Sequence, residues 1–147
     1  MREACAKVEH EQQAKVLADI IALEYPVHED RLCHLYAAQQ GISRVSAKVR
    51  AQVAELVAVY PHTEEEVGTF YWPQSVDPRT VKNFPLRRVE ERDVDQISMR
   101  ELRALARSIV DDGLEEPVAK LGHLLGFERV RGASRERLEN AWKTRNR

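Results

Sequence analysis

Hydrophobic residues recur three and four positions apart from about residue 5 to residue 56, a spacing that places them on one face of a helix. The pattern predicts a first helix over about residues 5–24, ended by Tyr25-Pro26, because proline lacks an N–H and disfavours a helical residue before it. A second helix is predicted from Glu29 or Asp30 to Gly41, which suits a left-handed cap. The third carries Val45, Val49, Val53 and Leu56 on one face.

Two β-prone segments are expected after the third helix. Val57–Tyr60 and Thr69–Trp72 flank the polar stretch Glu64–Glu66 and Gly68, which predicts a β-hairpin. Three helices followed by a hairpin is the order of a winged helix-turn-helix, so residues 1–72 are predicted to form a winged-helix-like unit. Phe70 and Trp72 share one face of their strand, where we expect them to close the core, with stacking on bases as the alternative.

A connector and a second helical unit are predicted in the remaining half. Prolines interrupt any periodic pattern over residues 73–95, so this connector is expected to be ordered only in part, with Phe84, Leu86 and Val89 packing over the core. Residues 96–147 predict three further helices. The first is expected to begin at the capping box Ser98–Glu101 and to end at Asp111–Gly113, and the second to begin at Glu116-Pro117 and to end at Gly126. The last is expected over Ala133–Thr144, with Leu138 and Trp142 buried.

The two halves resemble one another at an offset of 85 residues. Gly41-Ile42-Ser43-Arg44-Val45 matches Gly126-Phe127-Glu128-Arg129-Val130. Each of these segments separates two predicted helices, and we call them the first corner and the second corner. The chain is therefore predicted to be mainly α, with a winged helix-turn-helix-like unit followed by a second, related three-helix unit that has no room for a wing.

These segments also resemble a known family. Tyr25–His28, Gly41–Val45, Phe70–Pro73 and Leu121–Arg129 are similar to a bacterial domain of unknown function at the C-terminus of large superfamily-I helicase-like proteins. The resemblance covers about residues 14–143. It implies a helicase-associated module with no assigned activity, whose motor lies upstream in a parent or partner protein. The first half departs from the family pattern, because the glycine that many members have after the corner is found here only in the second half, as Gly132.

The balance of charged residues differs between the two halves of the chain. Residues 1–72 hold 7 Lys and Arg against 11 Asp and Glu, and residues 73–147 hold 16 against 13, although the whole chain has a net charge of only −1. Nucleic-acid binding is therefore expected from local patches, best sought in the C-terminal half. Arginine suits this role because its planar guanidinium reaches phosphate or guanine with two bonds. The candidate residues are Arg44, Lys48 and Arg50 in the first half and Arg129, Arg131, Arg135 and Arg137 in the second.

The alternative for these basic residues is a solvated helix face with local ion pairs, such as Arg135 with Glu139. The glutamates of the predicted wing, Glu64–Glu66, argue against DNA binding through the hairpin, since a wing that grips phosphate would carry Lys or Arg.

Other chemistry is not expected. The chain has no phosphate-binding loop ending in Lys-Ser/Thr, and Glu116–Lys120 has the wrong spacing for a nuclease metal site, so any motor or nuclease activity would lie in other domains. His28, Cys33 and His34 lack the spacing and the fourth ligand of a metal site. No cofactor, metal or catalytic residue is assigned. Two cysteines without a CxxC pair and short apolar runs suggest a cytoplasmic protein away from membranes.

The sequence thus predicts a non-catalytic, accessory module that binds DNA or RNA through its basic helix faces. The alternative function is protein–protein docking on a winged-helix scaffold, which the acidic N-terminal half suits better. If the arginines of the second half pair with neighbouring glutamates, the nucleic-acid hypothesis loses most of its support.

Overall fold

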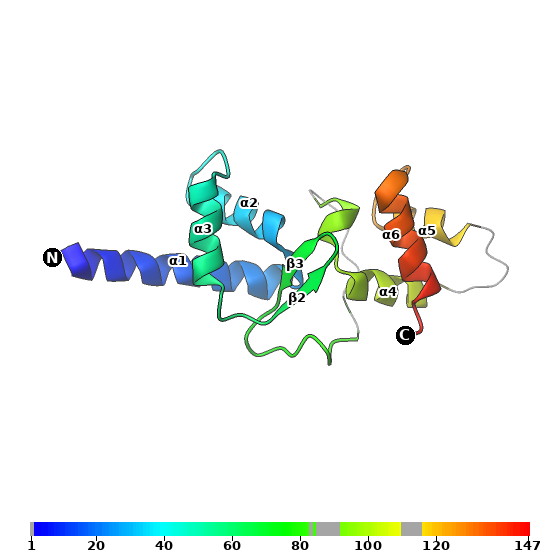
Figure 1. Cartoon of the computed structure of the whole chain (residues 1–147), viewed down its shortest axis with the longest axis horizontal. Helices are drawn as coiled ribbons and strands as arrows, with labels where there is room; N and C mark the ends of the chain where they lie inside the picture. Colours follow the sequence, from blue (N-terminus) through cyan, green and yellow to red (C-terminus); the bar gives the residue numbers. More distant parts are fainter. Residues whose placement is uncertain (1, 83, 85–91, 110–115) are drawn as a thin grey trace. The chain divides into compact units, whose positions relative to one another are not determined.

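The computed structural model describes residues 2–82, 84, 92–109 and 116–147. The chain is mainly helical, with one small antiparallel sheet, and it divides into two compact units, Met1–Arg79 and Thr80–Arg147 (Figure 1). The boundary between the units falls inside the expected connector of residues 73–95. Each unit has its own core and is described separately.

Three helices form the larger part of the N-terminal unit: α1 (Arg2–Glu24), α2 (Glu29–Gln39) and α3 (Ala47–Leu56). The predicted end of α1 at Tyr25-Pro26 and the predicted start of α2 at Glu29 are confirmed. Side chains cap the next two helices, which supplies acceptors for otherwise unpaired N–H groups. His28 Nδ1 accepts a hydrogen bond from Asp30 N at 3.1 Å, and Ser46 Oγ accepts one from Val49 N at 3.2 Å.

A three-stranded antiparallel sheet completes this unit, in the order β1-β3-β2. Its strands are β1 (Val27–His28), β2 (His62–Glu65) and β3 (Gly68–Tyr71). Val27 lies opposite Tyr71 in one ladder, and Thr63 lies opposite Phe70 in the other. The predicted hairpin is therefore present, and a short strand that the sequence did not suggest pairs with its second arm.

The prediction of a strand at Val57–Tyr60 is wrong. Val57 N still donates to Val53 O at 3.0 Å at the end of α3, and Tyr60 N donates to Val57 O in the turn that follows. Val57 is fully buried there, so its apolar character serves the packing of α3. The first arm of the hairpin is instead the polar segment β2, which pairs on one side only and needs no apolar run.

The core of the N-terminal unit lies between the three helices and the sheet. Phe70 and Trp72 are both 0 % exposed, which confirms the prediction that their rings close the core. Trp72 keeps a polar partner, because its Nε1 donates to Thr63 Oγ1 at 3.1 Å. The other largest buried side chains of this unit are Leu17, Ile21, Val27, Leu32 and Tyr36.

The described part of the C-terminal unit is helical, with a 3-10 turn η1 (Val94–Gln96) and helices α4 (Met99–Ser108), α5 (Pro117–Leu124) and α6 (Gly132–Lys143). The predicted starts at Ser98 and Pro117 are confirmed, and Ser98 Oγ accepts from Glu101 N at 3.2 Å. The predicted stop at Asp111–Gly113 and the packing of Leu86 and Val89 lie outside the described residues. Leu138 is fully buried, and Trp142 is half-buried against the same core.

The internal repeat extends to the backbone and the core. Ile42 N donates to Ala37 O at 2.8 Å, and at the same offset of 85 residues Phe127 N donates to Gly122 O at 2.9 Å. The glycine before each donor, Gly41 or Gly126, has a positive φ, 70° and 97° respectively, which glycine adopts without steric cost. Buried residues also recur at this offset, in the pairs Leu17 and Leu102, Ile21 and Ala106, Cys33 and Val118, Tyr36 and Leu121, and Val53 and Leu138.

Candidate nucleic-acid interface

The three basic candidates of the N-terminal unit lie after Gly41, around the start of α3. Arg44, Lys48 and Arg50 are all exposed, but Arg50 is partnered, since its Nη1 lies 2.7 Å from Asp30 Oδ1. That hydrogen bond is the main reason the pKa of Arg50 is raised, and the carboxylate offsets its charge. Within the described part of the chain, no ion pair involves Arg44 or Lys48. The first corner therefore offers two uncompensated positive charges.

The hairpin of the same unit is acidic. Glu64 and Glu65 lie on β2, and Glu66 follows at the turn. Glu64 and Glu66 are exposed, and Glu65 is half-buried. Because carboxylates repel phosphate, this hairpin is poorly suited to contact a nucleic-acid backbone.

The second corner brings three of the four C-terminal candidates together. Arg129, Arg131 and Arg135 are exposed and line an open groove of about 490 Å³ beside α5 and the start of α6. Arg129 and Arg131 also line a second groove of about 300 Å³, on whose wall Asp93 and Asp95 lie. These two exposed arginines therefore line both open grooves, where a ligand from solvent can reach them.

The pairing of these arginines decides how much charge the corner presents. Arg135 Nε lies 3.1 Å from Glu139 Oε1, one helical turn along α6, so this predicted local ion pair is present. Among the described residues, Arg129 and Arg131 form no ion pair with an acidic side chain. Two of the four C-terminal candidates thus keep their charge available to a partner.

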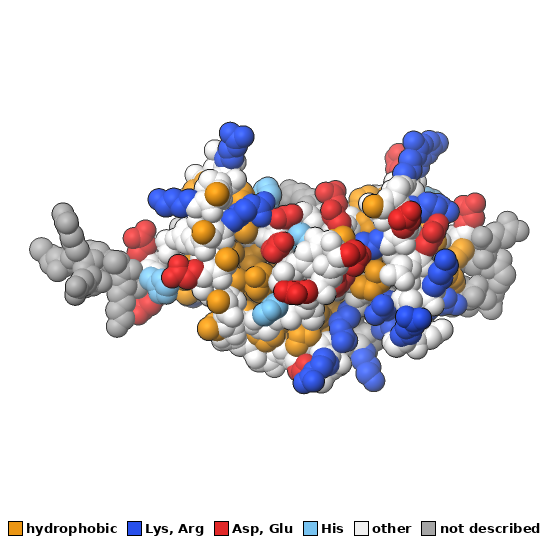
Figure 2. Space-filling model, viewed as in Figure 1, with side chains coloured by type: hydrophobic (Ala, Val, Ile, Leu, Met, Phe, Trp, Pro, Cys, Tyr) orange, Lys and Arg blue, Asp and Glu red, His pale blue; other side chains and the backbone are white. Residues whose placement is uncertain are grey.

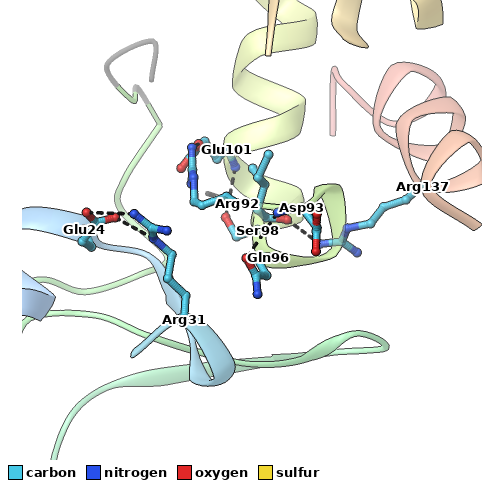
Figure 3. A network of polar contacts seen from close by, with 9 residues as sticks. Glu24, Arg31, Arg92, Asp93, Gln96, Ser98, Glu101 and Arg137 are labelled. Atoms are coloured by element: carbon cyan, nitrogen blue, oxygen red, sulfur yellow. Dashed lines mark hydrogen bonds and ion pairs between the residues drawn. The ribbon is translucent and has the colours of Figure 1, made fainter. Parts of the chain in front are cut away.

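The fourth candidate, Arg137, does not belong to the surface. It is only 5 % exposed, and its Nη2 donates to the main-chain oxygen of Ile97 at 2.7 Å. Figure 3 shows its side chain reaching from α6 toward the η1 segment, where Asp93 and Gln96 lie. The prediction that Arg137 binds nucleic acid is therefore wrong, because its guanidinium is occupied in holding α6 to the start of α4.

A helical signal in the sequence could have shown this. Arg137, Ala141 and Thr144 lie four and three residues apart and are all buried, together with Leu138. Residues at this spacing share one face of a helix, so Arg137 falls on the inner face of α6. Basic character alone could not distinguish it from its exposed neighbour Arg135.

A buried ion pair in the same unit was also missed. Arg92 Nη2 lies 3.2 Å from Glu101 Oε2, and both side chains are almost fully buried, at 3 % and 7 % exposure (Figure 3). The sequence suggested only that Glu101 would cap its own helix. Its carboxylate instead anchors the segment before η1 to α4, and such a pair is costly to break because a charge would be left buried alone.

The other chemically distinctive side chains have structural environments. His28 is buried, and its Nε2 lies 2.7 Å from Val67 O at the turn of the hairpin. Cys33 is a buried free thiol, and burial raises its pKa, whereas His34 is exposed with its Nδ1 2.7 Å from Asp30 O. Across the described residues, no group of three metal-ligating side chains comes together.

None of the described helices combines the length and the apolar character that crossing a bilayer requires. No protein-family model matches the chain, and no curated protein or solved structure matches it.

Proposed function

We propose that the chain is a non-catalytic, accessory module that binds DNA or RNA through the second corner and the start of α6. We call this region, residues 126–135, the C-terminal corner. The observation that carries the proposal is the pair Arg129 and Arg131, which are exposed, lie between two open grooves and form no ion pair with a described acidic residue. Arg135 contributes at the edge, where its exposed pair with Glu139 is weak and exchangeable in water.

The proposal includes a winged helix-turn-helix for the N-terminal unit. It is supported by the element order, in which α1, β1, α2 and α3 are followed by the hairpin β2–β3, and by the three-stranded sheet that the hairpin completes. The repeated corner supports treating the C-terminal unit as a related helix-turn-helix that lacks a wing. We further propose that the module acts beside a helicase-like motor in a cytoplasmic bacterial protein, which rests on the resemblance of the four short motifs alone.

Fluorescence anisotropy with a labelled DNA duplex at two salt concentrations tests the binding. Phosphate contacts weaken with salt, with a slope of about −0.9 per contact in a plot of log K against log salt concentration. The combined variant R129A/R131A should bind more weakly and lose about two units of that slope. A matched variant, R50A/R79A, removes two exposed arginines that already pair with Asp30 and Asp77 and should change the slope less. No binding of the unchanged protein at low salt would rule the proposal out.

A second candidate function, protein docking through the N-terminal unit, is favoured by its apolar surface. The large exposed hydrophobic side chains of the described residues all belong to this unit and are Val8, Leu23, Ile42 and Val59. Ile42 stands at the first corner, where Asp30 offsets the charge of Arg50. Association with a protein partner that persists at high salt and weakens in an I42S variant would favour docking over nucleic-acid binding.

A further inference from the structure

A second set of arginines lies along one helix of the C-terminal unit. Arg100, Arg103 and Arg107 of α4 are three and four residues apart, the spacing that aligns side chains on one face of a helix. The opposite side of α4 is apolar, with Leu102 and Ala106 fully buried. With a rise of about 1.5 Å per residue, the stripe is about 10 Å long.

The last turn of α6 and the residues after it extend this stripe. Arg107 Nη1 donates to the main-chain oxygen of Arg145 at 2.8 Å, and its Nη2 donates to that of Lys82 at 3.1 Å. Arg103 Nε donates to Thr144 Oγ1 at 2.8 Å. These contacts bring three segments of the chain together at one surface: α4, the residues just after α6, and residue 82, which is exposed. We call this surface the α4 face, composed of Lys82, Arg100, Arg103, Arg107 and Arg145.

The contacts that position Arg107 leave its charge in place. Both partners of Arg107 are neutral carbonyl groups, and Arg145 stacks on Trp142 with its guanidinium carbon 3.8 Å from the ring centroid. No ion pair among the described residues involves Arg100, Arg107 or Lys82. Figure 2 shows Lys and Arg side chains gathered around the end of α6. The protein thus holds Arg107 in place through neutral carbonyl groups, and no described acidic side chain pairs with Arg100 or Arg107.

The composition of this surface selects the class of partner. An anionic membrane or a protein groove would be expected to engage large apolar side chains beside the charges. The large exposed hydrophobic residues of the described chain all lie in the other unit. Arginines on one helical face instead match a row of phosphates, which the guanidinium group binds with two hydrogen bonds.

We infer that the α4 face is a second contact for the phosphate backbone of duplex DNA, separate from the corner of Arg129 and Arg131. The inference rests on the proposed nucleic-acid binding and extends its footprint along the C-terminal unit. The α4 face contacts phosphate only and carries no sequence information, because no helix of this unit has to enter a groove for these arginines to act.

The test compares salt slopes of duplex binding for the full chain and for R100Q/R107Q, with R129Q/R131Q as the corner variant. The α4 variant should lose about two units of slope, and R100K/R107K, which keeps both charges, should restore them. R79Q serves as the matched control, because Arg79 already pairs with Asp77 at 3.1 Å in the other unit. Circular dichroism melting checks that each variant is folded.

The outcomes separate the two proposals. If the full chain binds and R100Q/R107Q keeps the slope of the unchanged protein, the α4 face is not a contact, whereas the corner proposal stands. If only R100Q/R107Q loses slope, the α4 face is a contact and the corner is not. Absence of salt-sensitive binding by the unchanged protein overturns both, as does tighter binding to anionic vesicles than to the duplex.

Discussion

The buried position of Arg137 leads to a prediction that separates structural from ligand-binding arginines. Arg137→Met keeps most of the aliphatic stem but removes the guanidinium that donates to Ile97 O at 2.7 Å. A hydrogen bond from a charged group contributes about 1.5–3 kcal/mol, and the orphaned carbonyl is buried, so the free energy of unfolding should fall by about that amount. Arg131→Met changes an exposed residue and should cost less than about 0.5 kcal/mol.

The two tryptophans allow the C-terminal unit to be followed alone. Trp72 belongs to the N-terminal unit and Trp142 to the C-terminal unit, so a Trp72→Phe background leaves Trp142 as the fluorescent reporter during urea unfolding. The same variants are then tested for duplex binding under conditions where they are folded. Arg137→Met should bind as the unchanged protein does, and Arg131→Met should bind more weakly. A stable Arg137→Met protein that no longer binds DNA would refute the structural role.

Three further predictions concern caps and a buried thiol. Ser98→Ala removes the acceptor for Glu101 N and should lower the free energy of unfolding of the C-terminal unit by about 1 kcal/mol in urea. Ser108→Ala, at the far end of α4, should cost less, and equal costs would contradict the capping role of Ser98. His28→Ala removes both the cap of α2 and the contact with Val67 O, so Trp72 fluorescence should report a lower unfolding midpoint than in His34→Ala. Burial raises the pKa of Cys33 above its ordinary value of 9.0, so the neutral thiol is favoured in the folded state. The stability that this burial contributes is complete below the ordinary value and is lost as the pH rises from there through the raised pKa of the folded state. Iodoacetamide should alkylate Cys33 much faster in urea than in buffer, and equal rates would contradict its burial.

The helices could be predicted because their ends carry local signals. Pro26, Gly41, Ser98 and Pro117 each impose a backbone constraint or supply a cap within a few residues of the helix end. The strand β2 gave no such signal. Its polar segment His62–Glu65 is stabilised by the ladder with β3 rather than by apolar side chains of its own. The short strand β1 was also not predicted, because its partner β3 lies far along the chain.

The candidate site was predicted only in part, because charge is visible in sequence whereas burial and pairing depend on tertiary packing. The candidates Arg129 and Arg131 are exposed, but nothing within a few residues of Arg50 in the sequence indicates that Asp30 is its partner. The carbonyl that holds Arg137 is 40 residues away in the chain. The arginine stripe of α4 is visible in the sequence as helical spacing, but its contacts with residues 82 and 145 depend on the fold.

Nucleic-acid binding at the C-terminal corner can be mapped by titrating ¹⁵N-labelled protein with a short DNA duplex at low salt and following the amide chemical shifts. We predict that the largest changes fall on residues 126–135 and that added salt reverses them, because the contacts are to phosphate. Changes confined to the N-terminal unit around residues 42–50, or no changes at all, would contradict the assignment of nucleic-acid binding to the C-terminal corner.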